Sequence, residues 1–350
     1  MTDIAPARKR VLLEVKNLSK FFPIQKGFFR RVIGYVRAVD DVSFFINEGE
    51  TLGLVGESGC GKTTTARCIL RALTPTSGQI LFRTKDDQFV DLACLSRQEL
   101  RPFRPQIQMI FQDPYGSLNP RMTLFDIVGE PLLVNGMKDR KERAERVAEL
   151  LRLVEMRPEY MQRFPHAFSG GQRQRIGIAR ALALNPRLVV ADEPVSALDV
   201  SVQAQILNLM LELQNRLHLT YLFIAHNLSV IKHISHRVVV MYVGKIVETA
   251  RTQELFQCPK HPYTAVLLAA VPTPDPHRRM GKIELQGEVP SPANPPSGCY
   301  FHPRCPFVID LCQMEVPTLR EIAPEHWVSC HRADELDLTD FSLDRCVNRM

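Results

Sequence analysis

The sequence lacks any apolar run of about 18 residues, the length that a bilayer-spanning helix needs. Residues Met1 to Arg10 are basic, but the apolar stretch that follows reaches only to Glu14 and Lys16, which is too short for a secretory signal. The formal net charge is only +6 over 350 residues, and no block of lysine and arginine is dense enough to require a nucleic-acid or lipid partner. We therefore expect a globular protein that stays in the cytosol.

The composition is that of an ordinary globular chain, with 45% hydrophobic and 23% charged residues. The length predicts two domains, or one domain with an appendage. No internal repeat or low-complexity tract is visible. The character of the chain changes near 272, after which closely spaced prolines interrupt any regular element: Pro272, Pro274, Pro276, Pro290, Pro292, Pro295 and Pro296. This change predicts a domain boundary near 270–285.

Hydrophobic periodicity predicts an α/β fold. Residues 11–55 alternate apolar and polar residues around turn signals, which favours strands. Residues 188–240 repeat a strand–helix–strand pattern that indicates a βαβ sheet. Other expected elements are a short strand over 107–111 and helices over 64–73, 123–133 and 140–153.

A complete G-x-x-x-x-G-K-S/T loop follows the apolar run at 51–55 and opens a helix-like stretch. Such a P-loop places backbone N–H groups and a helix N-terminus around phosphate oxygens. The Lys62 ammonium would reach the β- and γ-phosphates, and the Thr63 hydroxyl would bind Mg²⁺. The sequence thus predicts an ATP-binding loop made of Gly56, Glu57, Ser58, Gly59, Cys60, Gly61, Lys62, Thr63 and Thr64.

A second chemical signal is the apolar strand at 188–191, which ends in two carboxylates, Asp192 and Glu193. We assign Asp192 to Mg²⁺, through water. Because side chains alternate along a strand, Glu193 is expected to point in a different direction from Asp192. Its predicted role is to activate or orient the water that attacks the γ-phosphate.

Between these two signals lies Phe168-Ser169-Gly170-Gly171-Gln172-Arg173. With the P-loop before it and the Asp-Glu pair after it, the chain resembles the ATP-binding cassette (ABC) family, in which two subunits clamp ATP between them. The resemblance implies a RecA-like core, an antiparallel β subdomain and a helical subdomain at about 113–180. It also implies that a partner subunit's ATP is bound by the signature residues Ser169, Gly170, Gly171 and Gln172. The family commonly has leucine where this chain has Phe168, a hydrophobic change that we expect to be harmless.

The same resemblance implies roles for four further residues. Gln112 resembles the Q-loop glutamine that senses Mg²⁺ and the attacking water, and His226 resembles the switch histidine at the γ-phosphate. Asp199 closes Ser196-Ala197-Leu198-Asp199, which resembles the D-loop that couples the two sites of a dimer. Phe22 resembles the aromatic residue that stacks on adenine, although Phe21 or Phe28 could serve instead.

Two late segments, 261–272 and 287–306, resemble the ATPases of oligopeptide and dipeptide importers, as does Phe111 to Pro120. The likeness spans about 11–332 and is greatest to the F-type subunit of the paired ATPases. It implies an ABC ATPase domain at 11–270, a Pro-rich, Cys-containing extension at 271–335 and a tail at 336–350. It further implies a peripheral subunit on the cytoplasmic face of the bacterial inner membrane, energising peptide uptake. The implied partners are a second ATPase, in an expected heterodimer, two membrane permease subunits and an extracytoplasmic solute-binding protein.

Other functions remain open at this point. An importer for nickel or another small solute would share every motif above, since the transported solute is selected by other subunits. A soluble cassette ATPase that acts on nucleic acid or the ribosome would typically carry a second cassette or a long insertion, whereas this chain has one cassette and no such insertion. A regulatory subunit that binds ATP without turnover is disfavoured by Glu193 and His226.

Four of the nine cysteines gather late in the chain, at Cys299, Cys305, Cys312 and Cys330. In a reducing cytosol such a group indicates metal binding rather than disulfides. The spacings lack the close C-x-x-C pairs of structural zinc sites and common ferredoxins, so chemistry alone allows zinc, an iron–sulfur cluster or free buried thiols. The resemblance to peptide-importer ATPases implies a 4Fe–4S cluster.

Overall fold

The computed structural model describes residues 10–27, 29, 31–271 and 287–341. The predicted boundary near 270–285 falls mostly outside these residues, as do the last part of the tail, 342–350, and the alternative adenine residue Phe28. The chain forms two compact units. The P-loop unit comprises Leu12–Ile46, Thr51–Cys94 and Ala225–Met350, and the signature unit comprises Met1–Val11, Asn47–Glu50 and Leu95–Ile224.

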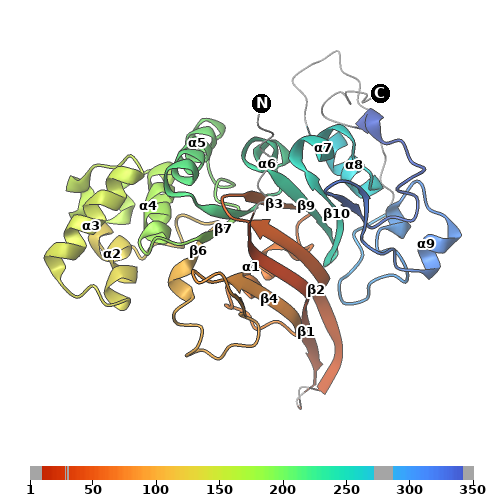
Figure 1. Cartoon of the computed structure of the whole chain (residues 1–350), viewed down its shortest axis with the longest axis horizontal. Helices are drawn as coiled ribbons and strands as arrows, with labels where there is room; N and C mark the ends of the chain where they lie inside the picture. Colours follow the sequence, from red (N-terminus) through yellow and green to blue (C-terminus); the bar gives the residue numbers. More distant parts are fainter. Residues whose placement is uncertain (1–9, 28, 30, 272–286, 342–350) are drawn as a thin grey trace, which may run out of the picture. The chain divides into compact units, whose positions relative to one another are not determined.

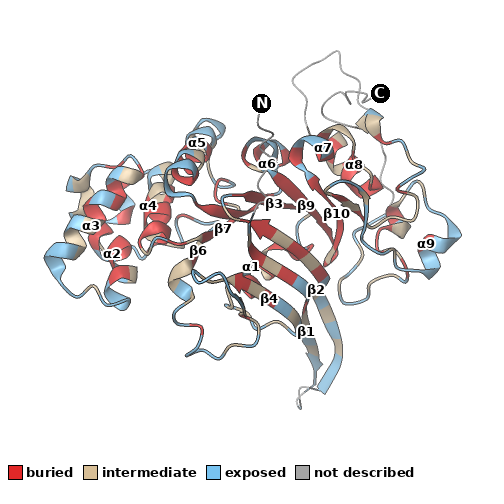
Figure 2. Cartoon of the chain, in the orientation of Figure 1, coloured by how far each residue is buried: buried red, intermediate tan, exposed pale blue. Residues whose placement is uncertain are grey.

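In the P-loop unit, one sheet has the strand order β2-β1-β4-β5, in which β4 is antiparallel to both β1 and β5. Its strands are β1 (Val11–Lys26), β2 (Arg31–Asn47), β4 (Ser77–Arg83) and β5 (Phe89–Asp91). Buried residues such as Leu13 and Val15 alternate with more exposed ones along β1, as a sheet with one covered face requires. The ends of β1 and β2 nearest their connection are exposed (Figure 2).

The other strands of the P-loop unit follow the order β11-β12-β10-β9-β3, in which β3 and β9 are parallel and the remaining pairs are antiparallel. β3 and β9 are buried along their whole length, which explains their continuous apolar sequence. The strand bounds are β3 (Thr51–Val55), β9 (Arg237–Tyr242), β10 (Lys245–Arg251), β11 (Arg320–Ala323) and β12 (His326–Val328). The helices are α1 (Lys62–Ile69), α6 (Leu228–Ile234), α7 (Thr252–Gln257), α8 (Pro262–Ala269) and α9 (Asp310–Met314), with the 3₁₀ turns η4 (His302–Arg304) and η5 (Thr339–Phe341).

The signature unit contains three parallel strands in the order β8-β7-β6, with register pairs such as Ile110 with Ala191. Their bounds are β6 (Ile107–Ile110), β7 (Leu188–Asp192) and β8 (Thr220–Ile224). Helices α2, α3 and α4 pack against one another, as Figure 1 shows. The helices are α2 (Leu124–Val134), α3 (Arg140–Leu153), α4 (Gly170–Leu182) and α5 (Val200–Leu217), and the 3₁₀ turns are η1 (Arg104–Gln106), η2 (Pro158–Gln162) and η3 (Pro165–Ala167).

The predicted elements are confirmed with shifted ends. The helix expected over 64–73 begins earlier, at Lys62, and ends at Ile69, because Arg71 adopts a left-handed φ of 53° that no α-helix continues through. Thr123 precedes α2 and caps it by accepting a hydrogen bond from the backbone N–H of Asp126. The helix over 140–153 has the predicted bounds. Among the described residues, no helix combines the length and the apolar character needed to cross a bilayer.

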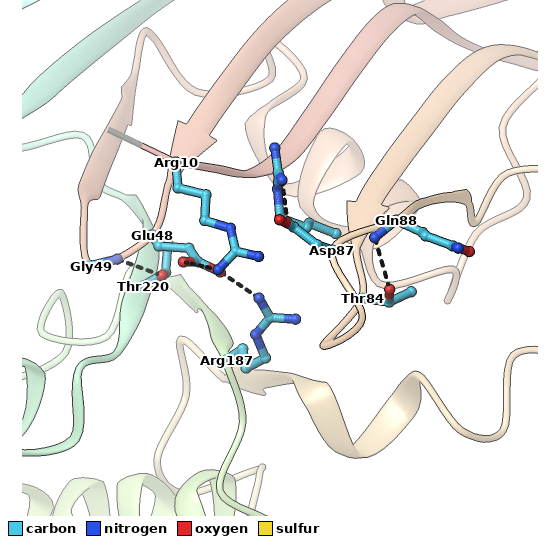
Figure 3. Close-up of polar contacts among 9 residues, drawn as sticks. Arg10, Glu48, Gly49, Thr84, Asp87, Gln88, Arg187 and Thr220 are labelled. Atoms are coloured by element: carbon cyan, nitrogen blue, oxygen red, sulfur yellow. Dashed lines mark hydrogen bonds and ion pairs between the residues drawn. The ribbon is translucent and has the colours of Figure 1, made fainter. Parts of the chain in front are cut away.

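The short segment Asn47–Glu50 is fastened within the signature unit by polar contacts. Figure 3 shows Arg10 and Arg187 directed at the carboxylate of Glu48, which forms an ion pair with each. The backbone N–H of Gly49 donates to the Thr220 hydroxyl at 2.9 Å. The ion pairs are partly exposed, so each contributes at most about 1 kcal/mol to the restraint of this segment.

Candidate functional site

The P-loop connects β3 to α1 in the P-loop unit, which confirms the predicted strand–loop–helix setting. Gly56 and Gly61 adopt φ angles of 149° and 109°, which side chains rarely tolerate. A Cβ on Gly56 would lie 2.1 Å from the carbonyl oxygen of Met241, and one on Gly61 would lie 2.2 Å from that of Ala38. Only glycine therefore fits at both positions, and the resulting loop has the backbone form of a phosphate cradle.

Lys62 is the first residue of α1 and is only 5% exposed. Its ammonium donates to the carbonyl oxygens of Gly56 and Glu57 at 2.8 and 3.0 Å. Burial raises the pKa of the neighbouring Cys60 thiol, although the positive charge of Lys62 opposes this rise. The ammonium thus lies inside the loop, at the position from which a P-loop lysine reaches phosphate.

Glu57 has contacts that the sequence motif does not predict. Its backbone N–H donates to the Tyr263 hydroxyl at 2.8 Å. Its carboxylate accepts two hydrogen bonds from Arg304, at 2.9 and 3.2 Å. Tyr263 and Arg304, one from each of the two late segments that resemble peptide-importer ATPases, therefore contact the P-loop directly.

Two other predicted site residues belong to the same unit. His226 is exposed in the turn before α6, where Asn227 caps the helix by accepting from the backbone N–H of Ser229 at 2.9 Å. Phe22 is half-buried on β1, and the Lys20 ammonium lies 5.1 Å from its ring centroid. Phe21 lies beside it, with the Arg37 guanidinium 5.9 Å from its ring, so the choice of adenine-stacking residue stays a prediction.

In the signature unit, Asp192 ends β7 and is 3% exposed. Glu193 follows with a left-handed φ of 47°. The expectation that strand alternation sets the direction of Glu193 is therefore wrong, because the strand has already ended and a turn sets its direction. The Glu193 carboxylate accepts a hydrogen bond of 2.8 Å from the side-chain amide of Gln112, which follows β6. The two residues thus form a polar pair at the carboxyl ends of neighbouring strands.

The signature residues form the start of α4. Ser169 caps the helix with a capping box: its hydroxyl accepts from the backbone N–H of Gln172 at 3.4 Å, and the Gln172 side chain accepts from the backbone N–H of Ser169 at 3.1 Å. A Cβ on Gly171 would lie 2.5 Å from Cγ1 of Val202 on α5. A cavity of about 400 Å³ is lined by Ser169, Gly171, Gln172 and Val202, together with others that include Arg157, Tyr160, Arg175 and Gln205. The spacing of Ser169 and Gln172 in the sequence, S-x-x-Q, is the pattern typical of a capping box.

Asp199 also caps a helix. Its carboxylate accepts from the Ser201 hydroxyl at 2.7 Å and from the backbone N–H of Val202 at 2.9 Å, at the start of α5. The hydrogen bond from Ser201, followed by that from Val202, lowers the pKa of Asp199. The predicted coupling role of Asp199 therefore coexists with a structural one.

The four late cysteines line one small cavity of about 10 Å³, together with His261 and His331. Burial raises the pKa of Cys299 to about 11 and that of Cys305 to about 12, and it also raises that of Cys330. The fold thus gathers thiols that are up to 31 positions apart in the sequence (Cys299 to Cys330). Within the described ranges, no three histidine, cysteine, aspartate or glutamate side chains have the arrangement of a metal-binding group.

A glycine-built P-loop at the start of one helix and a serine-capped signature at the start of another define an α/β nucleotide-binding cassette. Residues 39–196 match the family described as ABC transporter, and residues 247–312 match the family described as Oligopeptide/dipeptide transporter, C-terminal region.

Similar proteins agree. The chain is 53% identical to the oligopeptide transport ATP-binding protein AppF of Bacillus subtilis, over 93% of this chain and 98% of that protein. It is also 53% identical to the probable peptide ABC transporter ATP-binding protein y4tS of Sinorhizobium fredii, over 91% of this chain and 89% of that protein. Among solved structures, the dimeric ATP-binding cassette MJ0796 bound to ADP and Pi matches with a TM-score of 0.59 and 28% identity, covering 69% of this chain and 99% of that one. The structure of cbiO1 from Clostridium perfringens matches with a TM-score of 0.59 and 26% identity, covering 71% and 91%.

The chain belongs to the family of ABC transporter ATP-binding proteins, and within it to the oligopeptide/dipeptide group. It is an ATPase, and the predicted ABC cassette fold and the resemblance to the ATPases of oligopeptide and dipeptide importers are confirmed. ATP is accordingly its substrate, with Mg²⁺ as the accompanying ion.

Proposed function

We propose that this ATPase energises peptide uptake as a subunit of a bacterial ABC importer, peripheral to the cytoplasmic face of the inner membrane. The observation that carries this proposal is the match of residues 247–312 to the oligopeptide/dipeptide C-terminal region, in addition to the cassette itself. Relatives named for peptide transport support it along nearly the whole chain. We place the ATPase domain at 11–270, the Pro-rich, Cys-containing extension at 271–335 and the tail at 336–350.

The proposed chemistry is in-line attack of water on the γ-phosphate. Lys62 and the P-loop amides would hold the phosphates. Thr63, Gln112 and Asp192 would hold Mg²⁺, which would supply charge neutralisation. Glu193 accepts the proton of the attacking water, and the 2.8 Å hydrogen bond from Gln112 keeps its carboxylate in one orientation. His226 contacts the γ-phosphate, and Phe22 stacks on adenine.

The signature residues are proposed to bind ATP that a second cassette holds. The capping box at Ser169 marks the N-terminus of α4. The first backbone N–H groups of a helix point out of this end and stabilise an anion placed there. A single chain thus supplies one P-loop and one signature, and a second ATPase, in a heterodimer, completes both sites. Asp199 at the start of α5 couples the two.

The surface that follows Gln112 is proposed to receive a cytoplasmic helix of the permease. This segment, Pro114 to Pro120, is held on α4 by two arginines. The Arg173 guanidinium lies 4.3 Å from the Tyr115 ring centroid, and Arg180 donates to the carbonyl oxygen of Ser117 at 2.7 Å. Tyr115 is 55% exposed, so it offers apolar area to a partner. Two permease subunits and an extracytoplasmic solute-binding protein would complete the importer.

The cysteine cavity is proposed to hold a 4Fe–4S cluster, with zinc as the alternative. What supports the proposal is the donor chemistry: the four cysteines line one small cavity, and thiolate is the ligand that both iron–sulfur clusters and zinc accept. The cluster would be held by Cys299, Cys305, Cys312 and Cys330. Its contribution would be structural, since it would link segments that bury little apolar surface.

The metal proposal is tested by assaying iron and acid-labile sulfide in anaerobically purified protein. We expect both in the wild type and a large loss in Cys305→Ser. The control is Cys94→Ser, which changes an exposed cysteine outside the cavity. Stoichiometric zinc without iron would reject the cluster in favour of the alternative.

Peptide import is tested by isolating the tagged chain with its membrane partners and reconstituting them in proteoliposomes. We expect ATP-dependent uptake of labelled peptides with the wild type and with Glu149→Gln, an exposed control on α3. Glu193→Gln should abolish this uptake. Uptake of nickel chelates in place of peptides, or ATPase stimulation by nucleic acid, would contradict the proposal.

A further inference from the structure

The C-terminal part of the chain contacts the P-loop at one residue, Glu57. Arg304 lies at the end of η4 and is 8% exposed. Its Nη1 and Nη2 atoms donate to the two carboxylate oxygens of Glu57, at 2.9 and 3.2 Å. This is the bidentate arrangement that makes an arginine–carboxylate pair both strong and directional. It joins positions 247 residues apart.

A second contact holds the backbone of the same residue. The Tyr263 hydroxyl accepts the Glu57 N–H at 2.8 Å, and the Tyr263 side chain is fully buried near the start of α8. The Glu57 carbonyl in turn accepts from the Lys62 ammonium at 3.0 Å. The N–H, carbonyl and carboxylate of Glu57 are therefore all engaged, two of them by residues that follow the cassette motifs.

The supporting residues are themselves rigidly packed. The rings of Tyr242, Tyr263 and Phe301 form an aromatic cluster with centroid separations of 4.6, 5.2 and 5.5 Å. Arg304 also donates to the Tyr242 hydroxyl at 3.3 Å. Burial lowers the pKa of Arg304, but its bonds to Glu57 and Tyr242 outweigh that effect and leave the pKa raised, so the guanidinium stays charged. Interlocked aromatic side chains have few alternative rotamers, which fixes the donor and acceptor atoms that meet Glu57.

We propose that Arg304 and Tyr263 are positioning residues for the ATPase reaction, which hold the P-loop through Glu57 in the form that receives phosphate. A loop that binds phosphate through its backbone must have its N–H groups in place before the nucleotide arrives. Tyr263 and Arg304, which lie outside the cassette motifs, hold the P-loop backbone in place through their contacts with Glu57. Neither side chain touches the reacting atoms in this role; both act through Glu57.

The test is the affinity of the full-length protein for a fluorescent ATP analogue, followed by steady-state ATPase kinetics of the assembled complex. Loosening the P-loop weakens binding in the ground state and the transition state alike, so KM should rise while kcat changes little. For Arg304→Gln we expect Kd and KM to rise about tenfold. Arg304→Lys should recover part of this loss, because it keeps the charge but not the bidentate geometry.

Two further variants separate positioning from general stability. Tyr263→Phe keeps the ring in the aromatic cluster and removes only the acceptor, so it should raise Kd without unfolding the protein. Glu57→Gln should raise Kd as Arg304→Gln does, and the double variant should be no worse than either single one, because both remove the same interaction. Arg320→Gln, which breaks an exposed pair with Asp334, is the matched control and should leave Kd unchanged.

Wild-type Kd in both Arg304→Gln and Tyr263→Phe would overturn the proposal, as would independent addition of the Glu57 and Arg304 effects. A fall in kcat that matches a fall in the folded fraction, at unchanged Kd, would also overturn it, since that result indicates a purely structural role. These readouts need no transported solute, so they test the positioning role independently of peptide import.

Discussion

The side-chain amide of Gln112 donates to the Glu193 carboxylate at 2.8 Å, which joins residues 81 positions apart in the sequence. Gln112 follows β6 and Glu193 follows β7, and these strands are parallel neighbours. Parallel strands bring their carboxyl ends to the same edge of a sheet, which is where ligands of α/β proteins bind. The contact therefore gives the proposed base a defined orientation at the position expected for the reacting water.

Glu193→Gln should retain ATP binding and lose nearly all turnover, by a factor of about 10² to 10⁴, because the amide cannot accept the proton of the water. The amide oxygen can still accept from Gln112, so the local geometry should survive. The measurement is ATPase rate together with binding of a fluorescent nucleotide. An unchanged rate in the assembled complex would overturn the assignment of Glu193 as the base.

Gln112→Ala should lower kcat by about tenfold, which corresponds to loss of one hydrogen bond to a charged group, ~1.4 kcal/mol. Affinity for Mg-ATP should fall less than kcat, because Thr63 and Asp192 would still hold Mg²⁺ and the P-loop would still hold the phosphates. Steady-state kinetics separate the two effects. A larger rise in KM than fall in kcat would place Gln112 in binding instead.

Lys62→Ala should abolish measurable ATP binding, since it removes the ammonium that lies inside the P-loop in contact with Gly56 and Glu57. Lys141→Ala is the control, because Lys141 is exposed on α3. Equilibrium titration with a fluorescent ATP analogue distinguishes the two variants. Equal affinities would show that Lys62 does not contact the phosphates.

Gly171→Ala should strongly reduce turnover, because the new methyl group would lie 2.5 Å from Cγ1 of Val202 and displace the start of α4. Overpacking of this kind costs about 1–3 kcal/mol. Adding Val202→Ala should relieve the contact and restore part of the activity. ATPase assays of the two single variants and the double variant provide the check, and an absence of any recovery would mean that the new methyl group obstructs the bound nucleotide itself.

Stability should fall as the pH drops from about 6.5 to 4. Burial lowers the pKa of His261 to about 4, although the neighbouring Glu248 charge opposes this shift. His326 contacts the same Glu248 carboxylate at 2.7 Å. Over this range the unfolded chain binds a proton at position 261 that the folded chain excludes, so the unfolding free energy decreases with falling pH, by about 3 kcal/mol in all.

His261→Asn tests this pH dependence without removing the helix cap. His261 Nδ1 accepts from the backbone N–H of Tyr263 at 3.0 Å, and an asparagine oxygen can accept the same bond but does not titrate. Urea unfolding at several pH values should show a shallower dependence in the variant. Identical slopes would assign the acid sensitivity to other groups.

Sequence reasoning located most elements because their signals are local. The apolar runs of β3 and β7 and the periodicity of α3 needed no knowledge of the fold. It failed at Glu193, where strand alternation was extended one residue too far, and at the end of α1, where Arg71 leaves the helix. In both cases the element ends because one residue adopts a left-handed φ. The side chains of its neighbours in the sequence do not dictate that backbone angle.

The sequence by itself determined the P-loop, since the positive φ angles at Gly56 and Gly61 are a local property of glycine. It likewise determined the Ser169 cap, which depends on a spacing of three residues. Only the tertiary structure decided that Arg304 meets Glu57, that Gln112 meets Glu193 and that four distant cysteines share one cavity. Contacts between residues so far apart in the chain depend on how strands and helices pack, and no local preference for a backbone conformation encodes that packing.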